Sequence, residues 1–273
     1  MNDQLAIIVT VYNNYAVLED FFSTLSKQTN INFHIFISDA SPQKQKIETN
    51  LPFSLYSIEN KGYSHGVNEG IREARIKGYE KFCIVNNDIL FDIHFVENMI
   101  NSINIHPTSL IGGKIFYAPQ YEYHKGSYKN VEQGHIIWYA GGTIDWNHVT
   151  THHIGVDLLD SEKYSQGQST EFITGCLMGY DINVFNKVGE WDESYFLYYE
   201  DTDYSVRAKK QGVSLIYDPS IVIWHKNAQS TDGSGSLIHQ KYQKQNRFRF
   251  GMKYAPLKTK LHLIKNYLLN TNY

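Results

Sequence analysis

The chain has 273 residues, of which 42% are hydrophobic and 19% are charged. A chain of this length can form one large domain or two small ones. Its formal net charge of −3 gives no broad basic field of the kind that binds nucleic acid, so we expect no nucleic-acid partner.

The cysteines and the apolar runs indicate the cellular location of the protein. Cys83 and Cys176 follow no metal-binding or disulfide spacing, so we expect reduced, buried thiols. The apolar run near the N-terminus is too short for a signal peptide, and no segment reaches the length of a membrane span. We therefore expect a cytoplasmic protein, which could also lie peripherally on the inner face of the cytoplasmic membrane.

Short β-branched runs alternate with helical patterns through the first 117 residues. Asp92 is the expected N-cap of one helix, and Gly78 is the expected end of another. Strands that alternate with helices predict βαβ units and a mostly parallel sheet. The expected strands are 5–11, 33–38, 53–58, 81–85 and 109–117, and the expected helices are 15–28, about 64–77 and 92–103.

Small polar residues follow four of these strands, at 10–14, 38–41, 59–66 and 86–88. Ligands of open α/β sheets bind beyond the carboxyl ends of the strands. Turn formation alone also selects small polar residues, but their repetition at four strand ends favours a ligand site. The glycines of the third segment let backbone approach a phosphate or ribose, although their spacing is that of neither a dinucleotide fold nor a P-loop.

Residues 118–170 lack a regular pattern and predict strands and long loops beside the sheet, where a substrate-binding insertion would lie. His152 and His153 could ligate a metal, but adjacent histidines without acidic partners are usually solvated loop residues. The chain also contains 21 Tyr, 14 Phe and 4 Trp. Aromatic residues with a polar group suit pockets that stack on sugars and bases, and a simple replacement of Phe by Tyr is the alternative explanation.

Three carboxylates, Glu200, Asp201 and Asp203, occupy four positions in the stretch YFLYYEDTDYSVRAKKQG. They lie at the start of a predicted helix that ends at Gly212. The helix dipole and the free N–H groups at such an end favour ionised carboxylates, which relieves part of the repulsion. N-capping alone would explain one of the three acids.

The segment 237–273 is basic and has a helical pattern that breaks near Pro256. It could be a membrane-surface helix, a helix packed on the main domain, or the contact of a homodimer, and packing is the preferred reading. Its apolar residues at helical spacing are Leu257, Leu261, Ile264, Leu268 and Leu269, with Lys258, Lys260 and Lys265 between them.

Motifs over residues 5 to 231 occur in an order that resembles one known family. They include IIVTVYNN, ISDAS, ENKGYSHGVNEGI, FCIVNNDI, WYAGGTID, HHIGVDLLDS, the stretch from FITGCLMGYD to YYEDTDYSVRAKKQG, and IVIWHKNAQST. The chain resembles an inverting glycosyltransferase of family 2, in the bacterial rhamnosyltransferase-like branch. The resemblance implies an α/β GT-A fold, a Rossmann-like nucleotide-binding mixed sheet flanked by helices. Residues 1–236 would form this domain, with a donor half at 1–117, an acceptor half at 118–236, and a helical tail at 237–273.

The resemblance also implies roles for individual residues. Asp201 would be the catalytic base, and Asp39 would accept from a pyrimidine N3–H. The metal-binding D-x-D of the family reads NND here, so Asn86 replaces a carboxylate, and Asp88 with His225 would hold Mg²⁺ or Mn²⁺. The implied donor residues are Thr10, Tyr12, Asn13, Asp39, Asn60, Gly62, Asn68, Asn86, Asn87 and Asp88. The expected acceptor residues are Gly142, Thr174, Gly175, Trp191 and Glu200.

The expected reaction moves a sugar from dTDP-L-rhamnose or a UDP-hexose to a growing cell-surface polysaccharide or a lipid-linked glycan. A metal would neutralise the departing diphosphate, and one carboxylate would take the proton of the acceptor hydroxyl. Two alternatives stay open. A nucleotidyltransferase would require a basic loop after the first strand, and TVYNNYAVLED has none. A non-catalytic carbohydrate-binding or scaffold protein would be consistent with the NND change.

Overall fold

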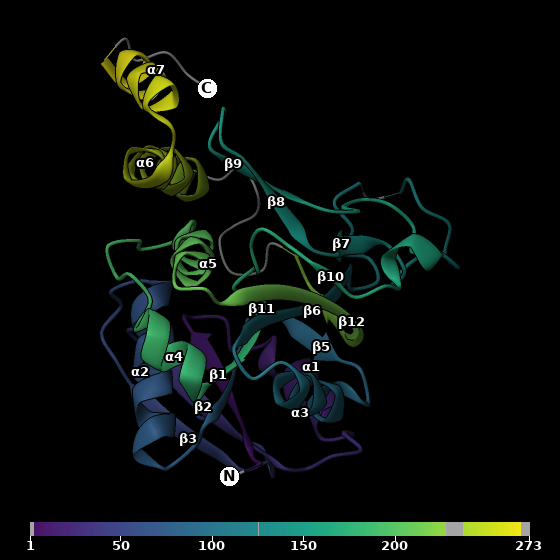
Figure 1. Ribbon diagram of the computed structural model, residues 1–273. Coiled ribbons are helices and arrows are strands. Elements are labelled where there is room, and N and C mark those ends of the chain that lie inside the picture. The colour runs from purple at the N-terminus through teal and green to yellow at the C-terminus, as the bar shows by residue number, and fades with distance from the viewer. Residues whose placement is uncertain (1–2, 125, 228–236, 269–273) are drawn as a thin grey trace.

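The computed structural model describes residues 3–124, 126–227 and 237–268. In this part of the chain, a ten-stranded sheet forms the centre of the molecule (Figure 1). Its strands are β1 (Leu5–Val11), β2 (Phe33–Asp39), β3 (Phe53–Ser57), β4 (Lys81–Val85), β5 (Ile89–Phe91), β6 (Ser109–Tyr117), β7 (Ile137–Tyr139), β10 (Gln168–Ser169), β11 (Leu177–Asp181) and β12 (Ser214–His225). The main strand order is β10-β12-β6-β11-β4-β1-β2-β3, with β5 paired to β12 and β7 to β6.

The strands predicted in the first 117 residues are confirmed, but the sheet is less parallel than their alternation with helices suggests. Strands β1 to β4 pair in parallel. Between β4 and β6 lies β11, which runs antiparallel to both of them. This strand arrives from the second half of the chain, so local alternation of strands and helices gives no sign of it.

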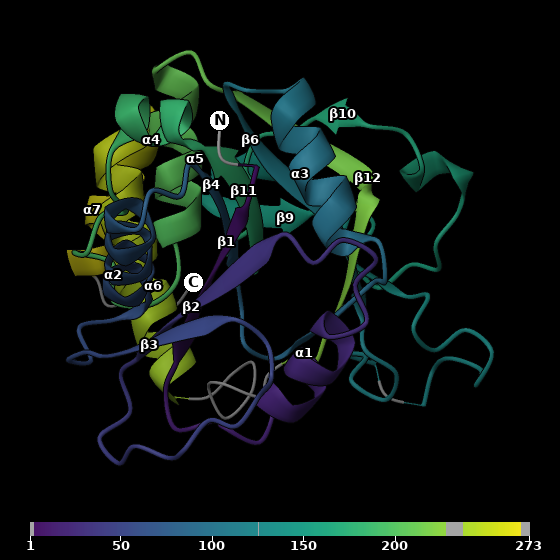
Figure 2. The same cartoon turned by 90° about the horizontal axis from the view of Figure 1, so that it is seen from below.

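Two layers of helices cover the sheet (Figure 2). Helices α1 (Leu18–Leu25) and α3 (Phe95–Ile105) lie on one face, and α2 (Tyr63–Ile76), α4 (Ile182–Val188) and α5 (Glu200–Lys210) lie on the other. Alternate residues of β1 enter the two separate core clusters, because successive side chains of a strand point to opposite faces. Gly78 and Gly212 have positive φ just beyond α2 and α5, as expected of residues that end a helix.

The expectation for Asp92 is wrong, because the N-cap of α3 is His94. The Asp92 carboxylate accepts a hydrogen bond from the His94 N–H at 2.9 Å and so forms a turn just before the helix. Asp, Asn and Ser favour turns and N-caps for the same reason, so sequence alone does not separate the two.

The insertion predicted at 118–170 contains strands and loops beside the sheet. Strands β8 (Gly142–Asp145) and β9 (Thr150–His153) form a hairpin, and residues Glu162–Tyr164 form a short 3₁₀ turn. Both cysteines are buried and free, as predicted. In the part of the chain that the structure describes, no helix combines the length and apolar character needed to cross a bilayer.

The tail forms two helices, α6 (Leu237–Tyr254) and α7 (Leu257–Leu268), which are separated near Pro256 as expected. Phe250 of α6 is fully buried, and its ring stacks on Trp146 with the centroids 5.7 Å apart. Helix α6 therefore packs on the rest of the molecule. The loop predicted at 230–236 and the apolar residue Leu269 lie outside the described residues.

A buried carboxylate joins α5 to α6. Asp203 is fully buried, and its two oxygens are 2.8 Å from the Arg207 Nε and 2.7 Å from the Lys253 Nζ. The Tyr254 hydroxyl donates to the same carboxylate at 2.7 Å. A buried charge destabilises a fold unless it is paired and hydrogen-bonded, and here both cations and the hydroxyl satisfy it. Asp203 thus fixes the position of α6 against α5.

Tyr254→Phe removes one donor to this buried carboxylate without changing the shape of the ring. Because hydrogen bonds to charged groups contribute about 1.5–3 kcal/mol, the free energy of unfolding should fall by about that amount in urea titrations. Tyr267→Phe is the matched control, since Tyr267 is 60% exposed and should change stability by no more than about 0.5 kcal/mol. Equal stability of the two variants would contradict the role given to Asp203.

Candidate active site

A cavity of about 1020 Å³ lies beyond the carboxyl ends of β1 and β4, between the sheet, the start of α5 and the first turns of α6. Strand ends far apart in the sequence meet there, as the strand-end argument predicts. Most of the residues proposed from the sequence line the cavity: Thr10, Tyr12, Asn13, Asn60, Gly62, Asn86, Asn87, Asp88, Thr174, Gly175, Glu200, Asp201 and His225. Asp39, Asn68, Gly142 and Trp191 do not.

Behind the segment that follows β1 lies Asp39. Its carboxylate is buried and accepts hydrogen bonds from the Tyr15 hydroxyl at 2.7 Å and the Ser41 N–H at 2.9 Å. The Ser41 hydroxyl in turn accepts from the N–H of Asn13 at 2.8 Å, and Asn13 has a left-handed φ of 58° that Asn tolerates well. These bonds shape the wall that presents Tyr12 and Asn13 to the cavity.

The start of α2 is joined to the segment just before α5. The N–H of Tyr63 donates to the Phe196 carbonyl at 2.9 Å, and the Tyr63 hydroxyl donates to the Gly175 carbonyl at 2.9 Å. Gly62 has a φ of +103°, and a Cβ at this position would lie 2.4 Å from the Phe196 carbonyl oxygen. Only glycine allows the two backbones to approach this closely.

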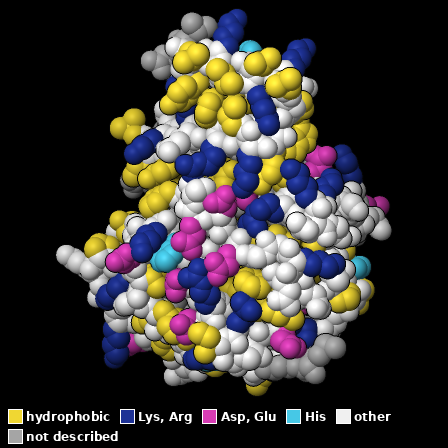
Figure 3. All heavy atoms as spheres, turned by 60° about the vertical axis from the view of Figure 1, so that its left-hand side comes forward, with side chains coloured by type: hydrophobic (Ala, Val, Ile, Leu, Met, Phe, Trp, Pro, Cys, Tyr) yellow, Lys and Arg dark blue, Asp and Glu magenta, His cyan; other side chains and the backbone are white. Residues whose placement is uncertain are grey.

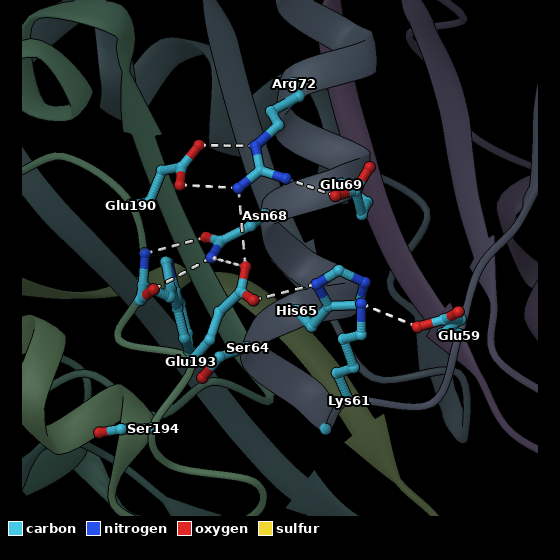
Figure 4. A network of polar contacts seen from close by, with 12 residues as sticks. Glu59, Lys61, Ser64, His65, Asn68, Glu69, Arg72, Glu190, Glu193 and Ser194 are labelled. Atoms are coloured by element: carbon cyan, nitrogen blue, oxygen red, sulfur yellow. Dashed lines mark hydrogen bonds and ion pairs between the residues drawn. The ribbon is translucent and has the colours of Figure 1, made fainter.

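Asn68 supports the cavity from outside, as part of a network of polar contacts (Figure 4). Its amide oxygen accepts from the Trp191 N–H at 2.9 Å, and its nitrogen donates to the Trp191 carbonyl at 3.0 Å and to Glu193 at 2.9 Å. Arg72 continues the network to Glu190 at 2.7 Å. The polar groups of Asn68 are therefore used within the protein, and the residue holds the segment 190–193 in place.

Trp191 and Gly142 also have packing roles. The Trp191 ring is buried and stacks on Tyr204, with the centroids 5.2 Å apart. A Cβ on Gly142 would lie 2.1 Å from the Phe172 ring, and its N–H donates to the Thr170 hydroxyl at 2.6 Å. Sequence motifs identify such residues without showing whether they touch a ligand or support those that do.

Asp88 and His225 come together although they lie far apart in the sequence. Asp88 ends the short loop between β4 and β5, and β5 pairs with the end of β12, where Ile89 is opposite His225. Both side chains are buried, and the His225 Nε2 lies 3.2 Å from a carboxylate oxygen of Asp88. The structure thus forms the pair that the resemblance implies.

This pair fits a divalent cation that is completed by its substrate. Carboxylate oxygen and imidazole nitrogen are accepted by Mn²⁺, and Mg²⁺ is commonly held by one or two carboxylates together with substrate phosphates. The buried Nδ1 of His225 has no hydrogen-bond partner among the described residues. Within these residues, no cluster of three or more His, Cys, Asp or Glu side chains could hold a metal alone. A diphosphate or water would have to supply the remaining ligands.

A strained turn precedes Glu200 and Asp201, the two carboxyls of α5 that line the cavity. Tyr198 and Tyr199 have φ values of 69° and 70°, which bulky residues rarely adopt. The Tyr199 hydroxyl donates to the Val149 carbonyl at 2.8 Å. From α6, the side-chain amide of Asn246 donates to the carbonyls of Leu197 at 2.8 Å and Tyr198 at 3.1 Å. The insertion and the tail therefore both hold this turn.

The two cavity carboxyls have different surroundings. Asp201 accepts from the Gly175 N–H at 2.9 Å and from the Thr202 N–H at 2.6 Å. Burial raises the pKa of Asp201, and these hydrogen bonds partly oppose the rise. Burial, followed by the charge of Asp201, raises the pKa of Glu200 well above its ordinary value. One oxygen of Glu200 has no hydrogen-bond partner among the described residues. Asp201 is therefore the more readily ionised of the two.

Sequence reasoning missed an aromatic wall of the cavity. The expectation that His153 is a solvated loop residue is wrong, because it lies in β9, lines the cavity and donates through Nδ1 to the Trp138 carbonyl at 2.9 Å. Burial lowers its pKa to about 4, so the ring is neutral near pH 7. The Trp138 ring lies between it and His225, with centroid distances of 4.4 and 4.7 Å.

Helix α6 also lines the cavity, although no sequence motif predicted this. Its lining residues are Ile238, His239, Lys241, Tyr242 and Gln243. Tyr242 stacks on Phe196 at 4.9 Å, so the same helix that holds the turn before α5 also closes one side of the cavity. The basic composition of the tail gives no sign of this role.

Gly62→Ala tests the contact between α2 and Phe196. We expect loss of stability in urea titrations together with weaker nucleotide binding in calorimetry, because the new Cβ pushes the two backbones apart. Gly78→Ala is the matched control. Its φ is also positive, at +82°, but its Cβ would meet nothing within 4 Å, so it should cost only about 1–2 kcal/mol and leave binding unchanged. The same result for both variants would show that the close approach is unimportant.

Comparisons with known proteins identify the family and the fold of the chain. Residues 6–189 match the family profile described as Glycosyl transferase family 2. An N-acetylglucosaminyl-diphospho-decaprenol L-rhamnosyltransferase, found in two strains of Mycobacterium tuberculosis, is 24% identical over 246 residues, which cover 85% of this chain and 78% of the relative.

Two solved structures share the fold at 14% identity. GalNAc-T7, solved with UDP, GalNAc and Mn²⁺, aligns with a TM-score of 0.63 over 88% of this chain, which spans 48% of the solved chain. The mannosyltransferase PcManGT of Pyrobaculum calidifontis, solved with GDP-Man and Mn²⁺, aligns with a TM-score of 0.54 over 95% of this chain and 69% of its own. The fold is the GT-A fold of glycosyltransferases, and the chain belongs to glycosyl transferase family 2.

Proposed function

We propose that the protein transfers a sugar, with inversion, from a nucleoside-diphosphate donor to a glycan or lipid-linked acceptor. The observation that carries this proposal is that one cavity holds both the Asp88–His225 pair and, on another wall, the carboxyls of Glu200 and Asp201. The first pair suits a diphosphate with its cation, and the second suits a hydroxyl that must lose a proton.

The donor would lie along the strand ends. The exposed Tyr12 ring offers a surface for the base, and Asn60, Gly62 and residues 86–88 line the space proposed for the ribose and diphosphate. The Asp39 carboxylate is buried and already accepts from Tyr15 and Ser41, so a direct bond to a pyrimidine N3–H, expected from the resemblance, would have to share it with these donors. We therefore propose that Asp39 acts first by shaping the nucleoside wall.

Asp88 and His225 would hold Mg²⁺ or Mn²⁺ together with the donor diphosphate. When bound, the cation would neutralise the charge that develops on the departing diphosphate. The Mn²⁺ in both solved glycosyltransferases supports this assignment. The Trp138 ring packs against His225 and limits how far the imidazole can turn.

Asp201 would accept the proton of the acceptor hydroxyl as its oxygen attacks the anomeric carbon in line with the leaving diphosphate. Hydrogen bonds from Gly175 and Thr202 fix the orientation of this carboxylate before substrate arrives. A single displacement needs one base and inverts the anomeric centre. The raised pKa of Glu200 favours its neutral form, so it could donate a hydrogen bond to the acceptor without repelling Asp201.

The identities of donor and acceptor rest on the relatives. The name of the mycobacterial protein specifies transfer of L-rhamnose to a sugar diphosphate on a polyprenol. That likeness supports dTDP-L-rhamnose, with a UDP-hexose as the alternative donor, and a lipid-linked glycan as acceptor. A non-catalytic carbohydrate-binding protein remains the rival function, because Asn86 occupies the place of a metal-binding carboxylate. Acceptor-dependent release of nucleoside diphosphate separates the two.

Asp201→Asn should lower kcat by about 10²–10⁴-fold and leave donor binding nearly intact, because Asn keeps the size of the side chain but cannot accept the proton. The pKa of Asp201 is raised above its ordinary value of 3.8, so wild-type kcat should fall as the pH decreases through that raised value and the base becomes protonated. Initial rates and calorimetric binding measure the two effects.

Glu200→Gln is the control for the choice of base, since it changes the neighbouring carboxyl and preserves Asp201. We expect a smaller loss of kcat, mainly through the acceptor KM. An inactive Glu200→Gln beside a fully active Asp201→Asn would move the base to Glu200. Full activity of both variants would show that neither carboxylate takes part in the reaction.

The metal proposal predicts that Mn²⁺ and nucleotide bind together. Because the protein provides only two of the ligands, Mn²⁺ should bind the protein at least about tenfold more tightly in the presence of UDP or dTDP. Asp88→Ala and His225→Ala should abolish this coupling in calorimetry, whereas the exposed neighbour variant His152→Ala should preserve it. Full transfer activity of the wild type in EDTA would rule out the metal role.

A further inference from the structure

The charges of the chain are divided unevenly between its two parts. Residues 237–268 contain eight Lys and Arg residues and neither Asp nor Glu, whereas residues 1–236 contain the other 17 basic residues and all 28 acidic ones. Helices α6 and α7 thus form a cationic hairpin on an otherwise acidic molecule. Figure 3 shows its dark blue basic side chains at the top of the molecule, with yellow hydrophobic side chains among them.

Helix α7 uses one face for packing and leaves an apolar stripe on another. Leu263 and Thr259 are buried, and Leu263 packs close to Gly251 of α6. The stripe consists of Leu257, Leu261, Ile264 and Leu268, which are 73%, 60%, 37% and 76% exposed. These residues are four, three and four positions apart, so at about 3.6 residues per turn they form one line along the helix.

Basic and amphipathic side chains flank this stripe. At helical spacing, Lys258 and Lys265 lie on one side of it, and Lys260 and Tyr267 lie on the other. Lysines can extend their stems along an apolar surface while the ammonium groups stay at its polar boundary, and Tyr favours the same boundary. The order of buried face, cationic flanks and apolar stripe is the arrangement of a helix that lies in a lipid interface.

We propose that the α6–α7 hairpin docks the protein on an anionic lipid surface through this stripe. Charge complementarity favours lipid over a second copy of the chain, because two cationic hairpins facing each other would repel. The same α6 lines the cavity with Ile238, Lys241 and Tyr242, so docking would bring the cavity close to the lipid headgroups. That last consequence rests on the proposed transfer to a lipid-linked acceptor, whereas the binding itself does not.

Co-sedimentation of the full-length protein with vesicles tests the proposal. We expect binding to phosphatidylcholine mixed with phosphatidylglycerol, little binding to phosphatidylcholine alone, and weaker binding as salt is raised. Lys258→Gln with Lys265→Gln should weaken binding to the anionic vesicles by about 30-fold. Leu261→Gln with Ile264→Gln should weaken it by about tenfold or more.

Matched controls lie elsewhere on the surface. Ile31→Gln removes an apolar residue that is 81% exposed, and Lys46→Gln removes a lysine whose side chain is 83% exposed, so neither should affect vesicle binding. Absence of binding to anionic vesicles, or unchanged binding by both hairpin double variants, would overturn the proposal. So would a dimer in sedimentation velocity that the hairpin variants convert to monomer without any change in vesicle binding.

Transfer to a water-soluble acceptor without vesicles is measured in parallel. The hairpin variants should retain this activity, because the changed residues lie outside the cavity lining. Failure of docking with intact transfer then contradicts the docking proposal alone. Docking without any transfer contradicts the proposed function alone.

Discussion

The buried carboxylate of Asp203 joins the two helices that define the cavity. Asp203 pairs with Arg207 within α5, and its bonds to Lys253 and Tyr254 tie α5 to α6. Helix α5 carries Glu200 and Asp201 in its first turn, and α6 closes one side of the space that they face. The third acid of the cluster is thus the structural member. Because its charge is paired, Asp203 can anchor the helix that holds Glu200 and Asp201 in a buried setting, which raises their pKa values.

The strained turn before α5 and the buried carboxyls that follow it cost free energy, and contacts with α6 and the insertion offset this cost. Tyr198 and Tyr199 adopt left-handed backbone conformations, and burial raises the pKa values of both cavity carboxyls. The turn persists because Asn246 and the Tyr199 hydroxyl bond it to α6 and to the insertion. Strain and buried acids concentrated at one place are expected where chemistry demands them. The tail is therefore part of the site, although its sequence carries no catalytic motif.

Much of the fold was predictable because hydrophobic periodicity and glycine positions are local signals. Strands β1 to β4, strand β6 and the helix ends at Gly78 and Gly212 followed from them, whereas the three-residue strand β5 did not. The placement of β11 between β4 and β6 did not, since pairing between distant segments leaves no local pattern.

The residues of the candidate site also divide into those that the sequence predicted and those that only the folded structure brings to the cavity. The strand ends and the pair Asp88 with His225 were found from position and resemblance, and they line the cavity. Asn68, Trp191 and Gly142 matched motifs, but they support its walls from behind. His153 and the lining residues of α6 reach the cavity only through tertiary packing, which spacing in the sequence does not encode.

The configuration of the newly formed bond tests the central claim most directly. The full-length protein is incubated with dTDP-L-rhamnose or a UDP-hexose, Mn²⁺ and a lipid-linked acceptor, and the anomeric proton of the product is assigned by NMR. One carboxylate base and a direct displacement predict a product whose anomeric configuration is opposite to that of the donor. A product that retains the donor configuration would contradict the account.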